Sequence, residues 1–388
     1  MDFQLDEEFR LLNETVNKFV ENELMPLEAA VLAREAHGGS HELTDEELAP
    51  LHDKCRELGL WGLDCPAETG GADLPAIALV GVNEALGRTI TPFTFPPDSP
   101  NLHMLLATAN EQQKAKYLEP YARGETISAI AISEPGAGAD PAGMTTRAVR
   151  DGDDWVLNGR KIWISRMDKA DFSIVMAITD PEKGSRGGIS AFLVDRDTPG
   201  LEITRKILLI GGHYNYEIAF VDCRLPASQL LGVEGQGFAP MQLRLIVRRL
   251  EMGAWCLGTA RRALDMLCDY ANQRETFGAP LADRQSIQWW VAEIETRCHC
   301  LQLMLWHAAT KQDAGGDVRT EASMIKLYGT ELATDAIDWA MQTYGAMGMT
   351  KELPLQLMAQ RVRLMRIYEG PSEIHRWVLA RQRLKQNA

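Results

Sequence analysis

The sequence lacks a long apolar segment and a recognisable targeting signal. No apolar run in its 388 residues approaches the ~20 residues that a helix needs to cross a bilayer. The first residues, MDFQLDEEFRLL, are acidic and amphipathic, unlike a signal or transit peptide. Basic residues are also few, since 40 Lys and Arg against 54 Asp and Glu give a net charge of −14. This balance argues against broad binding to nucleic acid or anionic lipid, so neither a nucleic-acid nor a membrane partner is expected.

Cysteines are scarce and are not arranged as metal ligands. There are seven, an odd number, scattered through apolar or helical contexts. The closest pair, Cys298 and Cys300, is two residues apart, which places the two thiols on different faces of a helix. A zinc site needs a Cys-x2–4-Cys pair with matching partners elsewhere, and the sequence has none. We interpret the cysteines as reduced, structural residues of a cytoplasmic protein and expect no metal site.

Nucleotide-binding fingerprints are missing as well. No GxGxxG or GxxxxGK[ST] stretch follows a strand and opens a helix, so neither a Rossmann unit nor a P-loop is supported. The composition, 45% hydrophobic and 24% charged, is that of an ordinary globular protein. A chain of 388 residues is too long for one small core, and its length predicts two or three packed units.

The apolar pattern divides the chain into three regions. Residues 1–125 show the three- and four-residue spacing of helices, as in Phe9, Leu12, Val16 and Phe19. Between 126 and 237 the chain has short runs rich in β-branched and aromatic residues, separated by turn signals such as DGDD, NG and GG. From 238 to 388 the helical spacing returns. We therefore predict an α+β protein in which a β-barrel or sandwich domain lies between two helical domains.

Two glycine-containing stretches of the β region could bind a ligand. The loop AISEPGAGADPAG, residues 131–143, has three glycines and two prolines, which let backbone N–H groups approach a ligand; a turn-rich connector has the same composition. In NGRKIWIS, residues 158–165, Asn-Gly predicts a hairpin turn, and the strand after it carries Trp163 and Ser165 on one face. The indole could pack against a flat cofactor, or Trp163 could be an ordinary buried residue of a sheet.

Two further stretches interrupt the C-terminal helical region. In QRETFGAPLADRQSIQ, residues 273–288, Arg274, Thr276 and Phe277 precede a Gly-x-Pro break. An arginine beside an aromatic ring at such a break suits contact with a phosphate or nucleotide, and it equally suits a helix corner with a solvated arginine. The second stretch, QTYGAMGM at residues 342–349, is by itself a glycine helix end.

The segment IYEGPSEIH, residues 367–375, places Glu369 before Gly370 and Pro371. Proline at the first helical position, with a glycine that lets the chain turn sharply, predicts a helix start here. Glu369 then lies on a connector between two helices, where it is either a solvated carboxylate or a base at a reaction centre. We interpret Glu373 as a first-turn carboxylate that the helix dipole favours.

In this order and at these separations, the motifs resemble the acyl-CoA dehydrogenase family over essentially the whole chain. The matching stretches are SEPGAGAD, NGRKIWIS, FVDCRLPASQLLGVEGQGF, RETFG with Gln285, QTYGAMGM and RIYEGPSEIHR. The resemblance implies an N-terminal helical domain at 1–125, a central β domain at 126–237 and a C-terminal four-helix domain at 238–388. It also implies an acyl-CoA substrate, FAD at a dimer interface, a homotetramer built as a dimer of dimers, and an electron-transfer flavoprotein as electron acceptor.

The resemblance also assigns roles to single residues. Ser133 would bond to the pyrimidine end of the flavin, Trp163 would pack beside its ring system and Ser165 would approach N5. Further cofactor contacts are implied for Ile132, Gly138, Ala139, Ile164 and Pro371. The neighbouring subunit would hold the pyrophosphate and adenosine with Arg274, Thr276, Phe277, Gln285, Gln342 and Gly345. Substrate contacts are implied for Ala139, Arg249, Tyr368 and Gly370.

Glu369 matches the catalytic base of the family. It would remove the α-proton of an acyl-CoA while the β-hydrogen leaves as hydride to flavin N5, which gives a trans-2-enoyl-CoA. The Glu369 backbone N–H and a ribityl hydroxyl would polarise the thioester carbonyl. Burial by the substrate is expected to raise the pKa of the carboxyl. Some relatives carry the base one residue before Arg249, but Arg248 cannot accept a proton, and Glu251 is expected to point elsewhere.

Four positions depart from the family pattern. Ser165 stands where the family usually has Thr, a mild change that keeps the hydroxyl. Ala139 stands where the family usually has Ser, which removes a hydroxyl contact to phosphate. Ile246 replaces a frequent acidic residue, so the CoA end is expected to be held differently. Pro371 replaces a frequent Thr and loses a contact to the nucleotide.

Alternatives to a dehydrogenase remain open at this point. An acyl-CoA oxidase, a desulfinase or a flavin monooxygenase could use the same scaffold. A non-catalytic scaffold is disfavoured by the presence of Glu369, Trp163 and Arg274. The sequence does not give the acyl chain length, although residues 89–101, with Phe93 and Phe95, are expected to shape the pocket wall.

Overall fold

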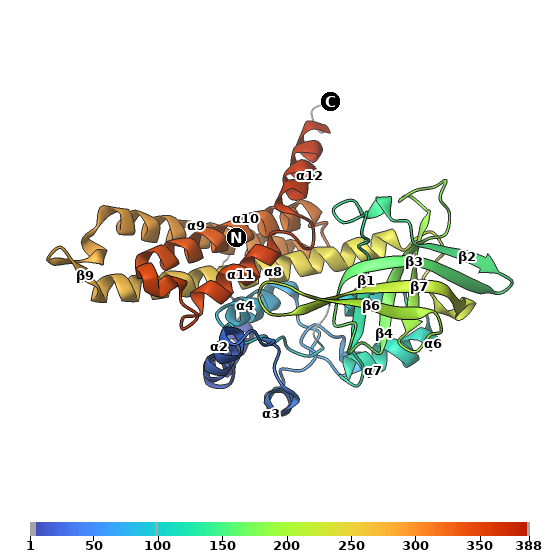
Figure 1. Ribbon diagram of the computed structural model, residues 1–388, viewed down its shortest axis with the longest axis horizontal. Helices are drawn as coiled ribbons and strands as arrows, with labels where there is room; N and C mark the ends of the chain where they lie inside the picture. The colour runs from blue at the N-terminus through green and yellow to red at the C-terminus, as the bar shows by residue number, and fades with distance from the viewer. Residues whose placement is uncertain (1–4, 98–99, 386–388) are drawn as a thin grey trace.

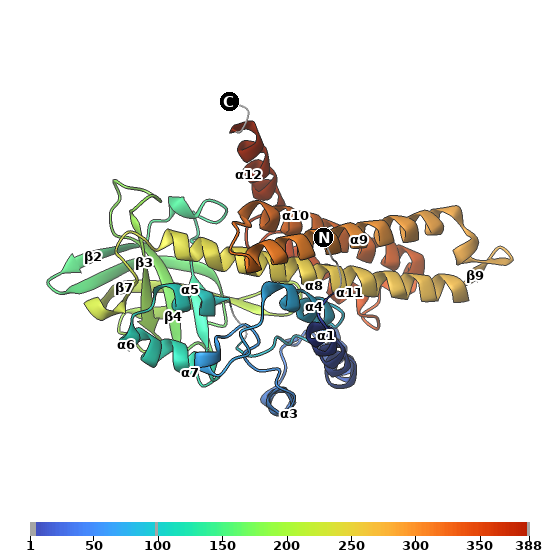
Figure 2. The same ribbon diagram turned by 180° about the vertical axis from the view of Figure 1, so that it is seen from behind.

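The computed structural model describes residues 5–97 and 100–385. Along these residues, a region of strands lies between an N-terminal and a C-terminal helical region. This confirms the predicted α+β class. The sheet lies at one end of the molecule and long helices extend from it toward the other end, with the N-terminal helices packed along one side (Figure 1; Figure 2 gives the reverse view). Residues 1–4 and 386–388, the ends of the expected terminal domains, lie outside the described residues.

The N-terminal region is built from short helices: α1 (Glu7–Phe19), α2 (Glu28–Ala36), α3 (Asp45–Glu57), α4 (Ala76–Gly87), α5 (Asn101–Thr108), α6 (Glu111–Gln113) and α7 (Glu119–Ala122). A capping box starts α3, where Thr44 and Glu47 each accept the backbone N–H of the other. The rings of Phe93 and Phe95 lie 5.6 and 5.4 Å from that of Phe19, so both phenylalanines belong to the core of this region. Residues 98–99 of the expected pocket wall lie outside the described chain.

The central region forms one sheet with the strand order β6-β7-β3-β2-β4-β5-β8, and β1 pairs in parallel with β4. The strands are β1 (Ser128–Ala131), β2 (Arg147–Asp151), β3 (Asp154–Ser165), β4 (Phe172–Ile178), β5 (Ile189–Asp195), β6 (Leu201–Leu208), β7 (Tyr214–Pro226) and β8 (Leu230–Leu231). Strands β4 and β5 are buried along nearly their whole length, because residues of both faces pack into core clusters.

The prediction of a hairpin turn at Asn158-Gly159 is wrong. The turn between β2 and β3 lies at Asp151–Asp154, with Gly152 at φ +64°, and β3 continues through Asn158 and Gly159. The Asn158 side chain bonds across to Asp222 of β7 instead of closing a turn. A Cβ on Gly159 would lie 2.4 Å from Thr146 Oγ1, so this glycine permits a close approach of the chain before β2.

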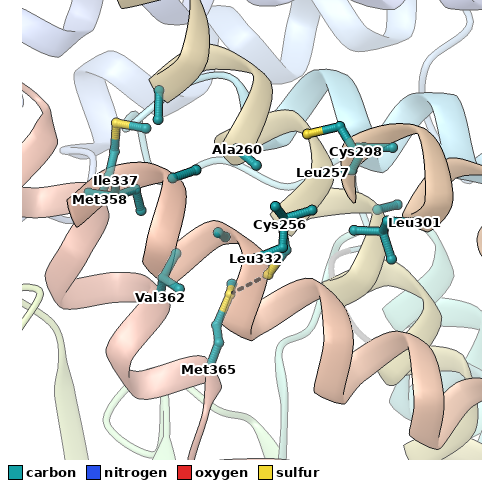
Figure 3. Close-up of a cluster of buried hydrophobic side chains, with 14 of the residues drawn as sticks. Cys256, Leu257, Ala260, Cys298, Leu301, Leu332, Ile337, Met358, Val362 and Met365 are labelled. Carbon is teal, nitrogen blue, oxygen red and sulfur yellow. Dashed lines mark hydrogen bonds between the residues drawn. The ribbon is translucent and has the colours of Figure 1, made fainter. Parts of the chain in front are cut away.

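Three long helices and two shorter ones form the C-terminal region: α8 (Phe238–Gln273), α9 (Gln285–Asp313), α10 (Arg319–Tyr344), α11 (Leu355–Met365) and α12 (Ser372–Lys385). A small hairpin, β9 (Glu275–Thr276) and β10 (Ala279–Pro280), joins α8 to α9. Figure 3 shows apolar side chains of α8, α9, α10 and α11 meeting in one core, in which Cys256 and Met365 place their sulfur atoms 3.7 Å apart. In the described part of the chain, no helix is long and apolar enough to cross a membrane.

Helix α8 fixes the N-terminal helices to the bundle through a close crossing with α4. A Cβ on Gly258 would lie 1.9 Å from the Glu84 carbonyl oxygen, and one on Gly87 would lie 2.0 Å from that of Trp255. Only glycine at both positions allows the two backbones to approach this closely. Thr259 closes the crossing by donating a 2.8 Å hydrogen bond to the Gly87 carbonyl. The middle of α8 is thereby fixed to α4.

Candidate active site

Glu369 lies on the connector between α11 and α12, at φ +57°, a backbone conformation that non-glycine residues rarely adopt. Its side chain is 13% exposed. Helix α12 begins at Ser372, so Pro371 is the residue before the helix and not its first residue as the sequence predicts. The strained backbone turns the Glu369 carboxylate away from solvent and toward α8.

Two arginines of α8 contact Glu369 in different ways. Arg244 Nη1 lies 2.9 Å from Oε1 and 3.1 Å from Oε2, so one guanidinium nitrogen bonds both carboxylate oxygens. Arg249 Nε donates to the Glu369 main-chain oxygen at 3.0 Å. Among the described residues the Glu369 backbone N–H has no acceptor, which leaves it free to bond a ligand.

The charge of Glu369 is set by these arginines. Burial by itself would raise the pKa of the carboxyl, but the guanidinium groups of Arg244, Arg248 and Arg249 outweigh burial and lower it. The family resemblance implies a raised pKa once bound substrate buries the carboxyl, and that expectation concerns the substrate-bound state. The protein itself supplies enough positive charge to keep Glu369 ionised well below neutral pH.

The remainder of the connector is held from α10 and α12. The Lys326 ammonium, which is fully buried, donates to the Gly370 carbonyl at 2.5 Å. His375 is 1% exposed, and burial together with the nearby charges of Arg249 and Lys326 lowers its pKa to about 3. His375 is therefore neutral at physiological pH, and it packs against Gly370, where a Cβ would lie 3.1 Å from its Nε2.

The loop after β1 is fixed by a buried ion pair. The Lys161 ammonium donates to the Ile132 carbonyl at 3.0 Å and to Glu134 Oε1 at 2.9 Å, and both charged side chains are at most 3% exposed. The Glu134 carboxylate also accepts from Thr145 and from the Thr146 backbone. Burial alone would raise the pKa of Glu134, but these partners lower it to about 2. The pair holds the two ends of the segment 132–146 together.

Trp163 and Ser165 lie beside this loop on one face of β3. The Ile162 backbone N–H bonds the Ser133 carbonyl at 2.9 Å, which joins the loop directly to the strand. Trp163 is 51% exposed at φ +65°, and Ile164 between the two expected contact residues is buried. Asn215 donates to the Trp163 carbonyl at 2.9 Å. A large aromatic side chain is thus presented outward by a locally strained strand.

A chain of hydrogen bonds connects Glu369, through Arg244, to the strand before this loop. Arg244 Nε donates to Asn101 Oδ1 at 3.0 Å, and Asn101 Nδ2 donates to Ser128 Oγ at 3.0 Å. Ser128 opens β1, whose end leads into Ile132 and Ser133. The structure therefore brings Glu369, with its neighbours Arg249, Tyr368 and Gly370, next to the strand that leads into the predicted flavin loop.

The remaining predicted cofactor residues do not join this group within one chain. The hairpin β9–β10 lies at the end of the bundle opposite the sheet (Figures 1 and 2). Thirty residues of α8 separate Arg244 from Arg274, a rise of about 45 Å. Tyr344 stacks on Tyr270 with ring centroids 4.1 Å apart, which places the end of α10 at the same distal end. The residues at this end are Arg274, Thr276, Phe277, Gln285, Gln342 and Gly345, and all except the half-buried Thr276 are exposed.

Several residues of the site were not predicted from the sequence. Arg244 contacts the Glu369 carboxylate, Asn101 bonds to Arg244, and Lys161 with Glu134 fixes the loop. One available signal was the spacing of four between Arg244 and Arg248, which places both on one face of a helix. Arg248 itself pairs with Glu251 at 2.9 Å, which explains why Glu251 does not compete with Glu369 as a base. Ile246 packs against the core of the bundle.

The residues present fit a flavin nucleotide. In the described part of the chain, the backbone N–H groups of Gly138 and Ala139 have no acceptor, and both residues are exposed. A Cβ on Gly138 would meet nothing within 4 Å, so the loop is open on that side. An adjacent surface hollow is lined by Glu134, Pro135, Gly136, Gly143, Thr145, Gly159 and Arg160. Free backbone donors beside an exposed indole suit an anionic group and a flat ring system.

Comparisons with known proteins agree with this geometry. Residues 6–125, 129–223 and 235–384 match the families described as acyl-CoA dehydrogenase N-terminal, middle and C-terminal domains. The chain is 40% identical to the (R)-benzylsuccinyl-CoA dehydrogenase of Thauera aromatica, over 99% of this chain and 97% of that protein.

Two solved structures are similar over nearly their whole length. The butyryl-CoA dehydrogenase of Megasphaera elsdenii has a TM-score of 0.86 at 28% identity and covers 99% of this chain and 100% of its own. The FAD complex of PigA has a TM-score of 0.88 at 29% identity, with 98% and 99% covered. The chain therefore belongs to the acyl-CoA dehydrogenase family, whose members are FAD-dependent oxidoreductases acting on a CH–CH bond of an acyl-CoA thioester.

Proposed function

We propose that this chain desaturates the α,β-bond of an acyl-CoA and that Glu369 removes the α-proton. The observation that carries the proposal is the placement of a largely buried carboxylate on a positive-φ connector, facing α8 and the start of β1. Glu369 is ionised, so its carboxylate oxygens can accept a proton. Arg249 fixes the main chain of the base, so the carboxylate is positioned by backbone contacts as well as by its own side chain.

The free backbone N–H of Glu369 supplies a second element of the reaction. A thioester α-proton is weakly acidic, so a base needs help from a donor at the carbonyl oxygen, where charge develops as the proton leaves. This N–H and the proposed base belong to the same residue. Binding of the thioester carbonyl oxygen to the N–H therefore places the α-proton near the Glu369 carboxylate. Bound FAD supplies the acceptor for the hydride that leaves the β-carbon. The residues proposed to hold it are Ile132, Ser133, Gly138, Ala139, Trp163, Ile164 and Ser165, with Pro371 beside the connector.

We further propose that a neighbouring subunit completes the cofactor site in a homotetramer. Within one chain the residues of the distal hairpin cannot reach the loop after β1, because α8 separates them. Phe277, at the tip of that hairpin, is 98% exposed. Trp289, Trp377 and Met349 are also more than half exposed, which supports contacts with other copies of the chain.

An electron-transfer flavoprotein is the acceptor that we propose for the reduced enzyme, on the basis of the family resemblance. A cytoplasmic location is proposed as well, supported by seven free cysteines, of which Cys55 and Cys65 have their pKa raised to about 12 by burial. These thiols stay protonated at neutral pH.

The test is anaerobic addition of short, medium, long, branched, cyclic and carboxylated acyl-CoAs to purified yellow protein. Bleaching of the flavin by at least one of them, with the matching 2-enoyl-CoA as product, supports the proposal. If none bleaches the flavin, the proposed desaturation is wrong. Admission of air to the reduced enzyme then distinguishes an oxidase from a dehydrogenase. The reduced flavin of an oxidase is reoxidised rapidly by oxygen, with formation of hydrogen peroxide.

A further inference from the structure

The proposed base is occupied by an arginine in this structure. Arg244 Nη1 bonds both oxygens of Glu369, and the two side chains are only 10% and 13% exposed. A carboxylate that accepts two charge-assisted hydrogen bonds is a weaker base than a free one. Proton removal from carbon therefore requires Arg244 to find another partner when the substrate binds.

An uncharged acyl chain offers no such partner. A hydrocarbon cannot accept a hydrogen bond, and a largely buried guanidinium without an anion costs several kcal/mol. With a plain fatty acyl chain in the site, Arg244 would stay on Glu369 and continue to depress its basicity. A second carboxylate on the substrate would satisfy the guanidinium and leave the base free.

The geometry of Arg244 suits a carboxylate ligand. Its Nε is fixed by Asn101, which is itself fixed by Ser128. Nη1 faces Glu369, and in the described part of the chain Nη2 has no hydrogen-bond acceptor. A guanidinium held at Nε with a free Nη2 presents a planar fork, the arrangement that binds carboxylates through two parallel bonds.

The surrounding charge favours an anion as well. Arg248 lies one helical turn after Arg244 on the same face of α8, and Arg249 follows it. Arg244 pairs with Glu369 and Arg248 with Glu251, whereas Arg249 bonds only the Glu369 main-chain oxygen, so these three arginines carry one more charge than their two acidic partners. An anionic acyl group would balance that excess.

We propose that the substrate is a CoA thioester with a second carboxylate on or next to the β-carbon, a succinyl-type acyl group, and that Arg244 binds this carboxylate in exchange for Glu369. This inference rests on the proposed desaturation and names its substrate class. The reaction is otherwise unchanged: the α-proton goes to Glu369 and the β-hydrogen leaves with its electron pair to the flavin. Arg244 acts as a specificity residue and, by releasing the base, couples substrate recognition to catalysis.

The test compares matched substrates. Benzylsuccinyl-CoA and methylsuccinyl-CoA are each paired with an analogue in which a methyl group replaces the free carboxylate, and kcat/KM for flavin reduction is measured anaerobically. We expect the carboxylated member of at least one pair to be preferred by about 100-fold or more. Arg244→Met should bring that ratio close to one, Arg244→Lys should restore it only in part, and Arg363→Met, which changes an exposed arginine of α11, should leave it intact.

A binding measurement keeps the test independent of how the variants fold. The wild-type holoenzyme is titrated with the carboxylated enoyl-CoA product and with its methyl analogue, followed by the flavin spectrum. Tighter binding of the carboxylated product supports the inference, and equal or weaker binding overturns it. If uncharged acyl-CoAs reduce the flavin and carboxylated ones do not, this inference fails while the proposed desaturation stands. If neither kind reduces it, the proposed desaturation itself is wrong.

Discussion

Arg249 donates a hydrogen bond from Nε to the main-chain oxygen of Glu369, 3.0 Å away. Helix α8 therefore holds the backbone of the proposed base through Arg249, separately from the contact between Arg244 and the Glu369 carboxylate. A change confined to that side chain should alter the chemistry and leave the connector in place.

Glu369→Gln should abolish most substrate-dependent flavin reduction while flavin content stays near wild type. The amide keeps the shape of the side chain but cannot accept the proton, and we expect the rate to fall by about 10²- to 10⁴-fold. Stopped-flow reduction by a good acyl-CoA substrate measures this. Glu373→Gln, an identical change at an exposed residue four positions later, is the control and should reduce at the wild-type rate. Wild-type reduction by Glu369→Gln would refute the assignment of the base.

The dependence of kcat/KM on pH should show the effect of the nearby arginines on the pKa of Glu369. Because Arg244, Arg248 and Arg249 lower the pKa of Glu369, the carboxylate stays ionised until the pH falls below its ordinary value of 4.5. No acid limb from Glu369 is therefore expected in kcat/KM between about pH 5 and 8. In Arg244→Gln the effect of burial is opposed by fewer charges, so the acid limb should move upward. Profiles with an uncharged acyl-CoA that reduces the flavin test this. A limb that stays in place or moves downward contradicts it.

Gly370, in the connector between α11 and α12, should tolerate substitution poorly. It has φ +95°, and a Cβ would lie 3.1 Å from His375 Nε2 and 3.5 Å from Arg249 Nη2. Gly370→Ala should lower stability by about 1 kcal/mol or more and, by shifting the base, slow flavin reduction at least about 10-fold. Gly315→Ala, at φ +76° with open space around it between α9 and α10, should cost similar stability without slowing reduction. Equal reduction rates in the two variants would show that the position of Gly370 is unimportant for the base.

The buried pair of Lys161 and Glu134 should control flavin retention. Lys161→Met leaves the Glu134 charge buried without its partner, so we expect a loss of about 3–5 kcal/mol in the stability of the central region and weaker flavin binding. Lys169→Met removes a half-exposed lysine paired with Glu42 and should cost at most about 1 kcal/mol. Thermal denaturation and the ratio of flavin to protein absorbance measure both effects. Unchanged flavin retention in a folded Lys161→Met protein would contradict the role of the pair.

The same pair predicts how stability varies with acid. Since the pKa of Glu134 is lowered to about 2 in the folded protein, its contribution is fully present above its ordinary value of 4.5 and is lost as the pH falls toward 2. The stability difference between wild type and Glu134→Gln should therefore shrink on acidification below pH 4.5. A difference that is constant across this range would show that Glu134 is not the titrating group.

The fold class followed from local patterns. The shift from helical spacing to short β-branched runs and back is a property of neighbouring residues, and the order of the motifs carried the family resemblance. Glu369 was found in the same way, because it lies within a contiguous stretch, IYEGPSEIH. Such signals survive in a single sequence, since each depends on residues that are adjacent in the chain.

Contacts between distant residues could not be predicted in this way. Arg244 is 125 residues from Glu369, and Asn101 is 143 residues from Arg244, so no local pattern links them. The error at Asn158-Gly159 has a similar origin, because the side-chain bonds of Asn158 to Asp222 replace the local turn. The charges that lower the pKa of Glu369 likewise come from a different helix, more than 100 residues away in the sequence.

The exposed hairpin offers a test of the proposed shared cofactor site. Phe277 is 98% exposed in one chain, so truncating it costs that chain almost no packing. If the hairpin of one subunit holds the nucleotide bound mainly by another, Phe277→Ala should lower flavin occupancy while each chain stays folded. Leu11→Ala, at another exposed apolar residue, should leave occupancy unchanged. Flavin content, light-scattering mass and circular dichroism are measured together on both variants. A folded Phe277→Ala protein with full flavin content and wild-type mass would exclude a cofactor contact by this ring, because an exposed side chain has no other route to affect a site at the opposite end of α8.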